Sequence, residues 1–489
     1  MNPMLQLADP QLFREHCYLD GQWIQADSAK SFAVHIKADG SVLGHVPECG
    51  AAETRRAIEA AQKALPAWAA RSALERGKIL KKLAALMMEH QEDLARLMTA
   101  EQGKPLAEAR GEVGYAASFF DWFAEEGRRL YGEVIPSPMA DKRFLTLRQP
   151  IGVVGAITPW NFPSAMITRK AGPALAAGCT IVIKPAESTP YSAFALAELA
   201  HRAGVPAGVF NVITGQPNDI GMELTSNPTV AKVSFTGSTP VGKRLMAQCA
   251  TTVKKVSLEL GGNAPFIVFA DADLEAAVAG AMISKYRNAG QTCVCANRLL
   301  VEDSIYDAFV AKLIEATSKL RVGDGLAGPT EQGPLINEKA VEKVEDHIKD
   351  AQAHGATVAL GGHRHRLGGT FFEPTILTGV TPAMKVAREE TFGPVAPVFR
   401  FKTEAEAVAM ANDTEFGLAA YFYSRDINRV WRVSEALEYG IVGVNTGIIS
   451  ATEAPFGGVK QSGIGREGSS HGITDYTEIK YVCMGGLTS

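Results

Sequence analysis

The first third of the chain shows a helical spacing of apolar and polar positions. Apolar residues recur every three or four positions, with charged residues between them, in three stretches. The pattern predicts helices over Ala51–Leu65, Ser72–Glu101 and Ala107–Tyr131. Gly103 and Pro105 indicate where the second helix ends. Aromatic residues follow one side of the third helix, a stripe typical of core packing in which one or two rings could line a pocket.

From Ile151 onward, short apolar runs alternate with helical stretches. The strand-like runs are Ile151–Ile157, Thr180–Lys184, Val209–Ile213 and Ala231–Phe235. The helical stretches between them are Thr168–Ala177, Tyr191–Ala203, Asp219–Thr225 and Val241–Ala250. Such βαβ alternation predicts a parallel, doubly wound sheet that binds ligands at the carboxyl ends of its strands.

A second series of the same kind begins near Pro265 and ends near Asn445. Its strand-like runs include Pro265–Phe269, Arg298–Glu302, Thr357–Leu360, Ala420–Tyr423 and Ile441–Asn445, with a helix over Asp273–Lys285. We place the boundary between the two series at Gly261 and Gly262, because two glycines allow a sharp turn or hinge. The expected fold class is therefore α/β, with two doubly wound, Rossmann-like domains.

Two further strand-like segments, Val134–Arg148 and Asp475–Met484, have no helical partner. An isolated strand needs an edge with which to pair, and another subunit could supply that edge.

Composition narrows the class of protein. The chain has 489 residues, of which 46% are apolar and 21% charged, and its net charge is −4 with both signs mixed. Two large globular domains are expected, and no Lys/Arg block offers a footprint for nucleic acid. No apolar run approaches the length that spans a bilayer, and the N-terminus lacks the features of a signal peptide. Seven scattered cysteines favour a reducing compartment, so a cytoplasmic enzyme is expected.

The most informative stretch is Arg287–Cys295, where Cys293 and Cys295 stand one residue apart after a predicted helix. A thiol in a loop of small and polar residues is a candidate nucleophile. The alternatives are a buried apolar cysteine or half of a metal site. No metal is expected, because the C-x-C pair has no second cysteine pair and no histidine nearby.

Polar residues after two of the predicted strands could complete such a site. Asn161 follows the first strand in a loop stiffened by prolines, and its amide could donate to an oxyanion, or it could form an Asx-turn or cap a helix. Lys184 and Glu187 follow the second strand, where a cofactor's ribose or phosphate would lie, or they could form a solvated ion pair.

Two further stretches carry candidate chemistry. Gly237 and Ser238 open a helix whose N–H groups suit a pyrophosphate, although the glycine spacing is not the usual dinucleotide fingerprint. Glu259 stands between two leucines, which would raise the pKa of its carboxyl as a general base requires. Its alternative is a glutamate on the solvent face of a strand.

These motifs together resemble the aldehyde dehydrogenase superfamily. Asn161, Glu259-Leu-Gly-Gly, Gly290-Gln-Thr-Cys293 and Glu390-Thr-Phe-Gly-Pro occur in the family's order and spacing, and the resemblance covers about residues 18–483. The stretches beginning at Ile167, Arg287 and Asn445 look most like succinate-semialdehyde dehydrogenases, with glutarate-semialdehyde dehydrogenases as near relatives.

The resemblance implies a domain plan. Residues 1–133 and 149–260 would form the dinucleotide-binding domain, residues 261–470 the catalytic domain, and residues 134–148 and 471–489 an oligomerisation arm. The implied assembly is a homodimer or homotetramer.

The resemblance also implies site residues. The catalytic residues would be Cys293 as nucleophile, Glu259 as general base and Asn161 as oxyanion donor, with Lys170 and Glu467 supporting proton transfer. The residues expected to bind the cofactor are Trp160, Lys184, Glu187, Gly237, Ser238, Glu390 and Phe392. Cys295 could form a reversible disulfide with Cys293, or it could be a buried bystander.

The expected substrate is a small aldehyde with a distal carboxylate. We hypothesise that Arg169 and Arg287 bind this carboxylate with help from Ser450, although either arginine alone could pair with a nearby acid. Glu187 favours NAD over NADP, because its carboxylate opposes a 2′-phosphate. The alternatives left open are a glutarate-semialdehyde or broader aldehyde dehydrogenase, a CoA-acylating enzyme, and a non-catalytic binding protein.

Overall fold

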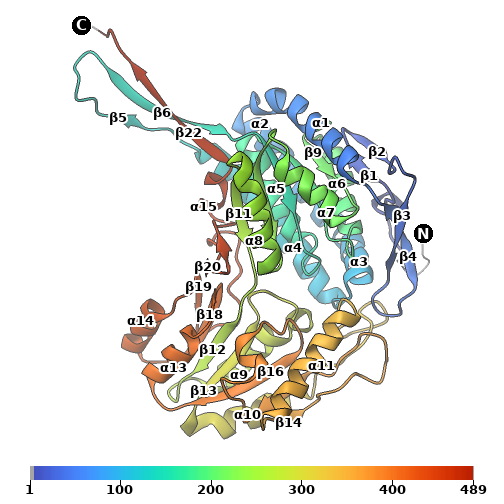
Figure 1. The fold of residues 1–489 in the computed structure, drawn as a ribbon, viewed down its shortest axis with the longest axis vertical. Helices are drawn as coiled ribbons and strands as arrows, with labels where there is room; N and C mark the ends of the chain where they lie inside the picture. Colours follow the sequence, from blue (N-terminus) through green and yellow to red (C-terminus); the bar gives the residue numbers. More distant parts are fainter. Residues whose placement is uncertain (1–4, 488–489) are drawn as a thin grey trace.

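Two open sheets, one in each half of the molecule, organise the fold (Figure 1). The computed structural model describes residues 5–487. Within that range the first sheet has eight strands in the order β2-β1-β9-β8-β7-β10-β11-β21, and the second has seven in the order β14-β15-β16-β13-β12-β18-β19. The central strands of both sheets are parallel. The predicted class, two doubly wound α/β sheets, is confirmed.

The first sheet contains all four strands predicted between residues 151 and 235. Its strands are β1 (Cys17–Leu19), β2 (Gln22–Ile24), β7 (Val153–Ile157), β8 (Thr180–Lys184), β9 (Phe210–Val212), β10 (Val230–Thr236), β11 (Lys255–Glu259) and β21 (Gly463–Ile464). The helices between them are α5 (Ala165–Ala177), α6 (Tyr191–Ala203), α7 (Pro217–Ser226) and α8 (Thr239–Cys249). The late strand β21 returns to this sheet by pairing with the end of β11.

Four helices precede this series: α1 (Ala51–Ala69), α2 (Ala73–Glu89), α3 (Gln91–Gln102) and α4 (Leu106–Glu126). The prediction of one helix over Ser72–Glu101 is wrong, because the backbone leaves the helical region at His90, with φ −99° and ψ 21°. The aromatic stripe on α4 packs in the core as expected, with Phe119, Phe120 and Phe123 fully buried.

The second sheet is built from β12 (Ala264–Val268), β13 (Ala296–Glu302), β14 (Thr357–Leu360), β15 (Thr375–Thr378), β16 (Val395–Phe401), β18 (Ala419–Tyr423) and β19 (Ile441–Val444). Its helices are α9 (Leu274–Tyr286), α10 (Tyr306–Thr317), α11 (Glu338–Ala353), α12 (Lys385–Arg388), α13 (Glu404–Asn412) and α14 (Ile427–Ala436). The five predicted strands and the predicted helix are all present, and no end differs from its predicted position by more than two residues.

A three-stranded antiparallel ribbon projects away from both halves (Figure 1). It consists of β5 (Val134–Ile135), β6 (Arg143–Pro150) and β22 (Thr477–Met484). The remaining short elements are β3 (Ser31–His35), β4 (Val42–Pro47), β17 (Phe416–Gly417), β20 (Val459–Lys460), α15 (His471–Thr474) and single 3₁₀ turns at Pro10–Leu12, Gly127–Arg129, Ala250–Thr252, Arg287–Gly290 and Asp303–Ile305. Across residues 5–487, no helix combines the length and apolar character needed to cross a bilayer.

Gly261 and Gly262 connect the two sheets, since β11 ends at Glu259 and β12 begins at Ala264. Neither glycine has a positive φ, so a left-handed turn is not what requires them. A Cβ on Gly262 would lie 2.6 Å from the carbonyl oxygen of Cys293, and one on Gly261 would lie 3.0 Å from Glu390 Oε2. The two glycines therefore allow the connection to pass close to the thiol loop and to a candidate cofactor residue.

Candidate functional site

Two cavities meet at Cys293. One has a volume of about 300 Å³ and the other about 350 Å³, and Cys293 and Met166 line both. The first extends toward α4 and α5, and the second toward the carboxyl end of β10 and the start of α8. The carboxyl edge of the strands is where the strand pattern predicts that ligands bind, and the second cavity lies at that edge.

The loop that carries Cys293 has an unusual backbone. Asn288, Ala289 and Gly290 have φ values of 52°, 55° and 75°, all in the left-handed region. A turn follows, in which the Cys295 N–H donates to the Thr292 carbonyl over 2.9 Å. Non-glycine residues rarely adopt such a conformation, and strain of this kind is concentrated at functional sites.

Cys293 itself is half-buried. Burial raises the pKa of its thiol to about 12, and the carboxyl groups of Glu390 and Glu259 act in the same direction. The guanidinium groups of Arg169 and Arg287 oppose this rise. A thiol with so high a pKa is mainly protonated at neutral pH, and the thiolate is the form of cysteine that acts as a nucleophile.

Asn161 lies beside the thiol loop, as the sequence predicted. Its side chain is buried, and Nδ2 donates one hydrogen bond to the Gln291 carbonyl over 3.1 Å. An amide carries two N–H donors, so a second donor remains for a ligand that occupies the cavity. This side chain does not form an Asx-turn or a helix cap, because its hydrogen bond is to Gln291 in the thiol loop.

Glu259 ends β11 and is only 3% exposed, which excludes a glutamate on a solvent face. Burial raises the pKa of its carboxyl well above the usual value, and the neighbouring Glu467 adds to this effect. Arg169 and Lys170 lower it in part. Glu259 Oε2 is buried without a hydrogen-bond partner within residues 5–487, and Glu259 lines neither cavity at Cys293.

Glu467 joins two residues of α5. Lys170 Nζ contacts Glu467 Oε1, and Arg169 Nε lies 2.7 Å from Glu467 Oε2. All three side chains are at most 4% exposed. The cluster places two cations and one carboxylate behind Glu259.

The cavity of about 350 Å³ is lined by five of the seven residues expected to bind the cofactor, namely Trp160, Gly237, Ser238, Glu390 and Phe392. The rings of Trp160 and Phe392 meet edge to face, with centroids 5.5 Å apart. Glu390 accepts a hydrogen bond from the Gly262 N–H over 3.1 Å, and burial raises the pKa of its carboxyl to about 7. Ser238 precedes the first turn of α8, where backbone N–H groups suit a phosphate.

The lining of this cavity also offers a polar atom that suits a bound dinucleotide. Thr236 Oγ1 is buried, lines the cavity and lacks a partner within the described residues. A buried hydroxyl without a partner costs free energy unless a ligand or water satisfies it.

Lys184 and Glu187, the other two expected cofactor residues, do not line that cavity. They form an ion pair with each other, Lys184 being buried and the Glu187 side chain 42% exposed. Burial lowers the pKa of Lys184. They still lie next to the site, because the Thr158 N–H donates to the Lys184 carbonyl over 3.1 Å.

A third cavity, of about 240 Å³, lies between α7 and α8 and was missed in the sequence. It is lined by Pro217, Asn218, Gly221, Met222, Arg244, Leu245 and Gln248. These residues form no motif, and only the packing of two helices brings them together.

The cavity of about 300 Å³ brings Arg169, Arg287 and Ser450 to the thiol. Arg169 stacks on Phe456 at 4.1 Å, and Arg287 lies over Phe162 at 5.2 Å. Arg169 Nη2 is buried without a hydrogen-bond acceptor within residues 5–487. The cavity thus combines an aromatic wall with a cationic donor that has no partner.

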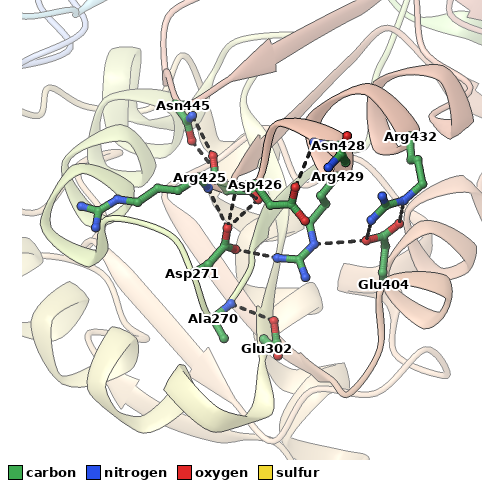
Figure 2. Close-up of polar contacts among 11 residues, drawn as sticks. Ala270, Asp271, Glu302, Glu404, Arg425, Asp426, Asn428, Arg429, Arg432 and Asn445 are labelled. Carbon is green, nitrogen blue, oxygen red and sulfur yellow. Dashed lines mark hydrogen bonds and ion pairs between the residues drawn. The ribbon is translucent and has the colours of Figure 1, made fainter.

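A polar network holds the base of the loop that carries Ser450 (Figure 2). Asp271 Oδ2 accepts hydrogen bonds from the N–H groups of Arg425 and Asp426, and Oδ1 accepts one from Arg429. Asn445, with φ 53°, exchanges two hydrogen bonds with the backbone of Ser424. The network therefore fixes where the loop leaves β19.

Cys295 lines neither cavity at the thiol. It is buried, and its thiol donates to the Lys285 carbonyl over 3.2 Å. A disulfide with Cys293 stays a prediction. Among residues 5–487, no three His, Cys, Asp or Glu side chains are grouped so as to hold a metal ion.

A thiol flanked by an amide donor and a buried carboxyl, at the junction of two cavities on a doubly wound sheet, defines an enzyme that uses covalent catalysis beside a nucleotide site. The model of the aldehyde dehydrogenase family matches residues 23–482, and the chain belongs to that family. It is an oxidoreductase that oxidises aldehydes with NAD or NADP. The predicted family is confirmed.

Relatives cover nearly the whole chain. The chain is 65% identical to the glutarate-semialdehyde dehydrogenase of Pseudomonas aeruginosa, over 99% of this chain and 100% of the relative. It is 65% identical to the NADP(+) succinate-semialdehyde dehydrogenase GabD of Escherichia coli, over 98% and 100%. The crystal structure of succinate-semialdehyde dehydrogenase from Burkholderia pseudomallei matches with a TM-score of 0.98 and 63% identity, over 98% and 100% of the two chains.

We predict that iodoacetamide alkylates Cys293 faster as the pH rises. Because burial raises the pKa of the thiol to about 12, the thiolate fraction should increase about tenfold per pH unit from neutral to strongly alkaline solution. Mass spectrometry of the labelled peptides measures this rate. The buried Cys295 should label far more slowly and serves as the internal comparison. A plateau near neutral pH would contradict the prediction.

Proposed function

We propose that this protein oxidises an aldehyde with a distal carboxylate, succinate semialdehyde or a close homologue, to the dicarboxylate. The observation that carries the proposal is the cavity of about 300 Å³, which holds Arg169, Arg287 and Ser450 together with Cys293. The names of the relatives at 65% identity support the same substrate class.

The lining of the cavity suits both ends of such a molecule. Tyr115, Phe162 and Phe456 provide apolar surface for the methylene groups. Arg169 Nη2 is a buried donor without a partner, and a guanidinium binds a carboxylate with paired, charge-assisted hydrogen bonds. Succinic and glutaric semialdehydes differ by one methylene, which is worth only about 1–3 kcal/mol in a pocket.

The chemistry begins at Cys293. Its thiolate adds to the aldehyde carbon, and the carbonyl oxygen becomes the oxyanion of a thiohemiacetal. The second N–H of the Asn161 amide, which does not take part in the hydrogen bond to Gln291, would donate to this oxygen. A hydrogen-bond donor that is fixed before the charge develops typically stabilises the transition state by about 3 kcal/mol.

A nicotinamide bound in the second cavity would supply the hydride acceptor that converts the thiohemiacetal to a thioester. Trp160 and Phe392 would wall this cavity, Glu390 would hold the nearby ribose, and the N-terminus of α8 would bind the pyrophosphate. The cavity of about 240 Å³ between α7 and α8 would hold the adenine, with Pro217, Met222 and Leu245 as apolar surface and the other lining residues mostly polar.

Glu259 then acts on water. Its raised pKa suits a base that must accept a proton near neutral pH, and the hydroxide equivalent releases the acid from Cys293. Glu467 lies beside Glu259 and would take up the proton, and the charge of Lys170, which is paired with Glu467, would hold that carboxylate in place. Because Glu259 would activate water, the acyl group on Cys293 should be released as the free acid and not transferred to CoA.

We also infer that two or more copies of the chain assemble through the projecting ribbon of β5, β6 and β22. Val134, Ile479 and Tyr481 on this ribbon are 85%, 59% and 56% exposed. Exposed apolar residues on an isolated ribbon suit burial against a second copy.

We predict that two substitutions separate the chemical steps. A Cys293→Ala protein should bind coenzyme but lose turnover, because no nucleophile remains. A Glu259→Gln protein should form one equivalent of reduced coenzyme in a burst and then deacylate slowly. Stopped-flow absorbance and mass spectrometry of the acyl-enzyme measure both, and full steady-state activity of Cys293→Ala would rule out the mechanism.

We predict that Arg169→Ala and Arg287→Ala, singly and together, raise KM for semialdehydes. Loss of charge-assisted hydrogen bonds to a carboxylate should cost about 1.5–3 kcal/mol each, or roughly 10- to 150-fold in kcat/KM. Simple aldehydes of the same length should be little affected by Arg287→Ala, whose side chain is only half-buried. Equal losses for both substrate types would count against carboxylate recognition.

We predict a preference for NAD over NADP that depends on Glu187. Two like charges about 4 Å apart repel by roughly 1 kcal/mol in water. Because Glu187 is half-exposed, its repulsion of a 2′-phosphate should be near this aqueous value. The kcat/KM should therefore favour NAD at least about fivefold. Glu187→Gln should lower the ratio of kcat/KM with NAD to kcat/KM with NADP. Glu275→Gln, which changes another exposed glutamate paired with a lysine, is the matched control and should leave the ratio unchanged. An unchanged ratio in Glu187→Gln would refute the assignment.

A further inference from the structure

A buried ion pair that the mechanism above does not use lies behind Asn161. Lys104 is in the turn between α3 and α4, and Glu112 is on α4. Their side chains are 0% and 1% exposed, and Lys104 Nζ lies 2.5 Å from Glu112 Oε2. Burying two charges is costly, and apolar residues of similar size often stabilise a fold as well, so such a pair calls for an explanation.

The pair holds the loop between β7 and α5 at both ends. Lys104 Nζ donates to the Asn161 carbonyl over 2.8 Å. Glu112 Oε1 accepts hydrogen bonds from the Ser164 and Ala165 N–H groups, over 3.0 and 3.2 Å, where α5 begins. The ammonium also lies 4.0 Å from the centroid of the Phe162 ring. The loop that carries the oxyanion donor is therefore held by one cation and one carboxylate.

The same contacts extend to the loop that carries the thiol. Asn288 Nδ2 donates to the carbonyl oxygens of Asn161 and Gln291, over 2.9 and 3.2 Å. Gln102 donates to Asn288 Oδ1 over 2.9 Å and accepts the Lys104 N–H over 2.8 Å. These bonds close a ring in which the Asn161 amide cannot rotate or shift independently of the Cys293 loop.

We propose that Lys104 is a positioning residue that, through the Asn161 carbonyl, holds the Asn161 amide at the place where the oxyanion forms. The inference rests on the proposed function, because it assumes that Cys293 forms a tetrahedral adduct. Lys104 lines neither cavity at the thiol, so its ammonium acts through the groups that it contacts, which are the Asn161 carbonyl, Glu112 and the Phe162 ring.

The test compares two reactions of Cys293 that need no coenzyme. Acylation by p-nitrophenyl acetate passes through an oxyanion and releases p-nitrophenolate as the thioester forms. Alkylation by iodoacetamide displaces iodide and forms no oxyanion. Lys104→Met should slow acylation by roughly 10- to 100-fold, the range for a displaced oxyanion donor, and change alkylation by less than about twofold. An equal change in both rates, or no change in either, overturns the proposal.

Three further variants separate positioning from loss of stability. Lys254→Met removes another buried lysine that donates to backbone carbonyls, those of Asn227 and Val230, and should leave the acylation rate unchanged. Lys104→Arg should restore part of the rate, since a guanidinium can donate to both acceptors. Glu112→Gln keeps an acceptor for Ser164 and Ala165 and should show a smaller loss with the same selectivity. If Lys104→Met does not fold, an unchanged acylation rate in Glu112→Gln overturns the proposal.

The two proposals fail in different ways. If p-nitrophenyl acetate leaves no acetyl group on Cys293 of the unmodified protein, the proposed nucleophile is wrong. If the acetyl group is found there and Lys104→Met acylates at the normal rate, only the role of Lys104 is wrong.

Discussion

The hydrogen bond from the Asn161 side chain to the Gln291 carbonyl joins the two sheets at the point where the chemistry takes place. It ties the loop after β7 of the first sheet to the thiol loop before β13 of the second. The glycine at 262 permits the same approach, since any side chain there would meet the Cys293 carbonyl. Because both cavities end at this junction, a small displacement of either loop would separate the thiol from the amide and change the shape of both cavities.

Charge around this junction is buried and nearly balanced. Arg169 and Lys170 face Glu467 and act on Glu259, and Lys104 faces Glu112. Pairing reduces the cost of burying each group, although it does not remove it. The exception is Glu259, for which burial and Glu467 together outweigh two nearby cations and raise its pKa. A base can therefore coexist with a protonated thiol a short distance away.

Local sequence was sufficient for most strands, because their apolar runs alternate with helical stretches. For Asn161 and Glu259 it left two interpretations each, and only the resemblance to a family favoured a catalytic role. Local sequence was not sufficient where the packing of distant segments determines a contact or a cavity. The break between α2 and α3 falls at His90, where no proline or glycine in the sequence marks it. Lys104 contacts a carbonyl 57 residues away, and the cavity between α7 and α8 is lined by residues without a motif. Lys184 and Glu187 were predicted near the cofactor, but their ion pair depends on side-chain positions that spacing does not determine.

Arg169 links the two ends of the proposed reaction. It lines the cavity for the substrate carboxylate, contacts Glu467, and lowers the pKa of Glu259 against the effect of burial. An anion bound against Arg169 would offset part of its positive charge, so the carboxyl of Glu259 would hold its proton more tightly. Under the proposed function, substrate binding and the basicity of Glu259 would thus be coupled through the guanidinium of Arg169. An aldehyde without a carboxylate would not offset the charge of Arg169, and it would leave the pKa of Glu259 unchanged. The charge of the substrate would therefore affect deacylation as well as binding.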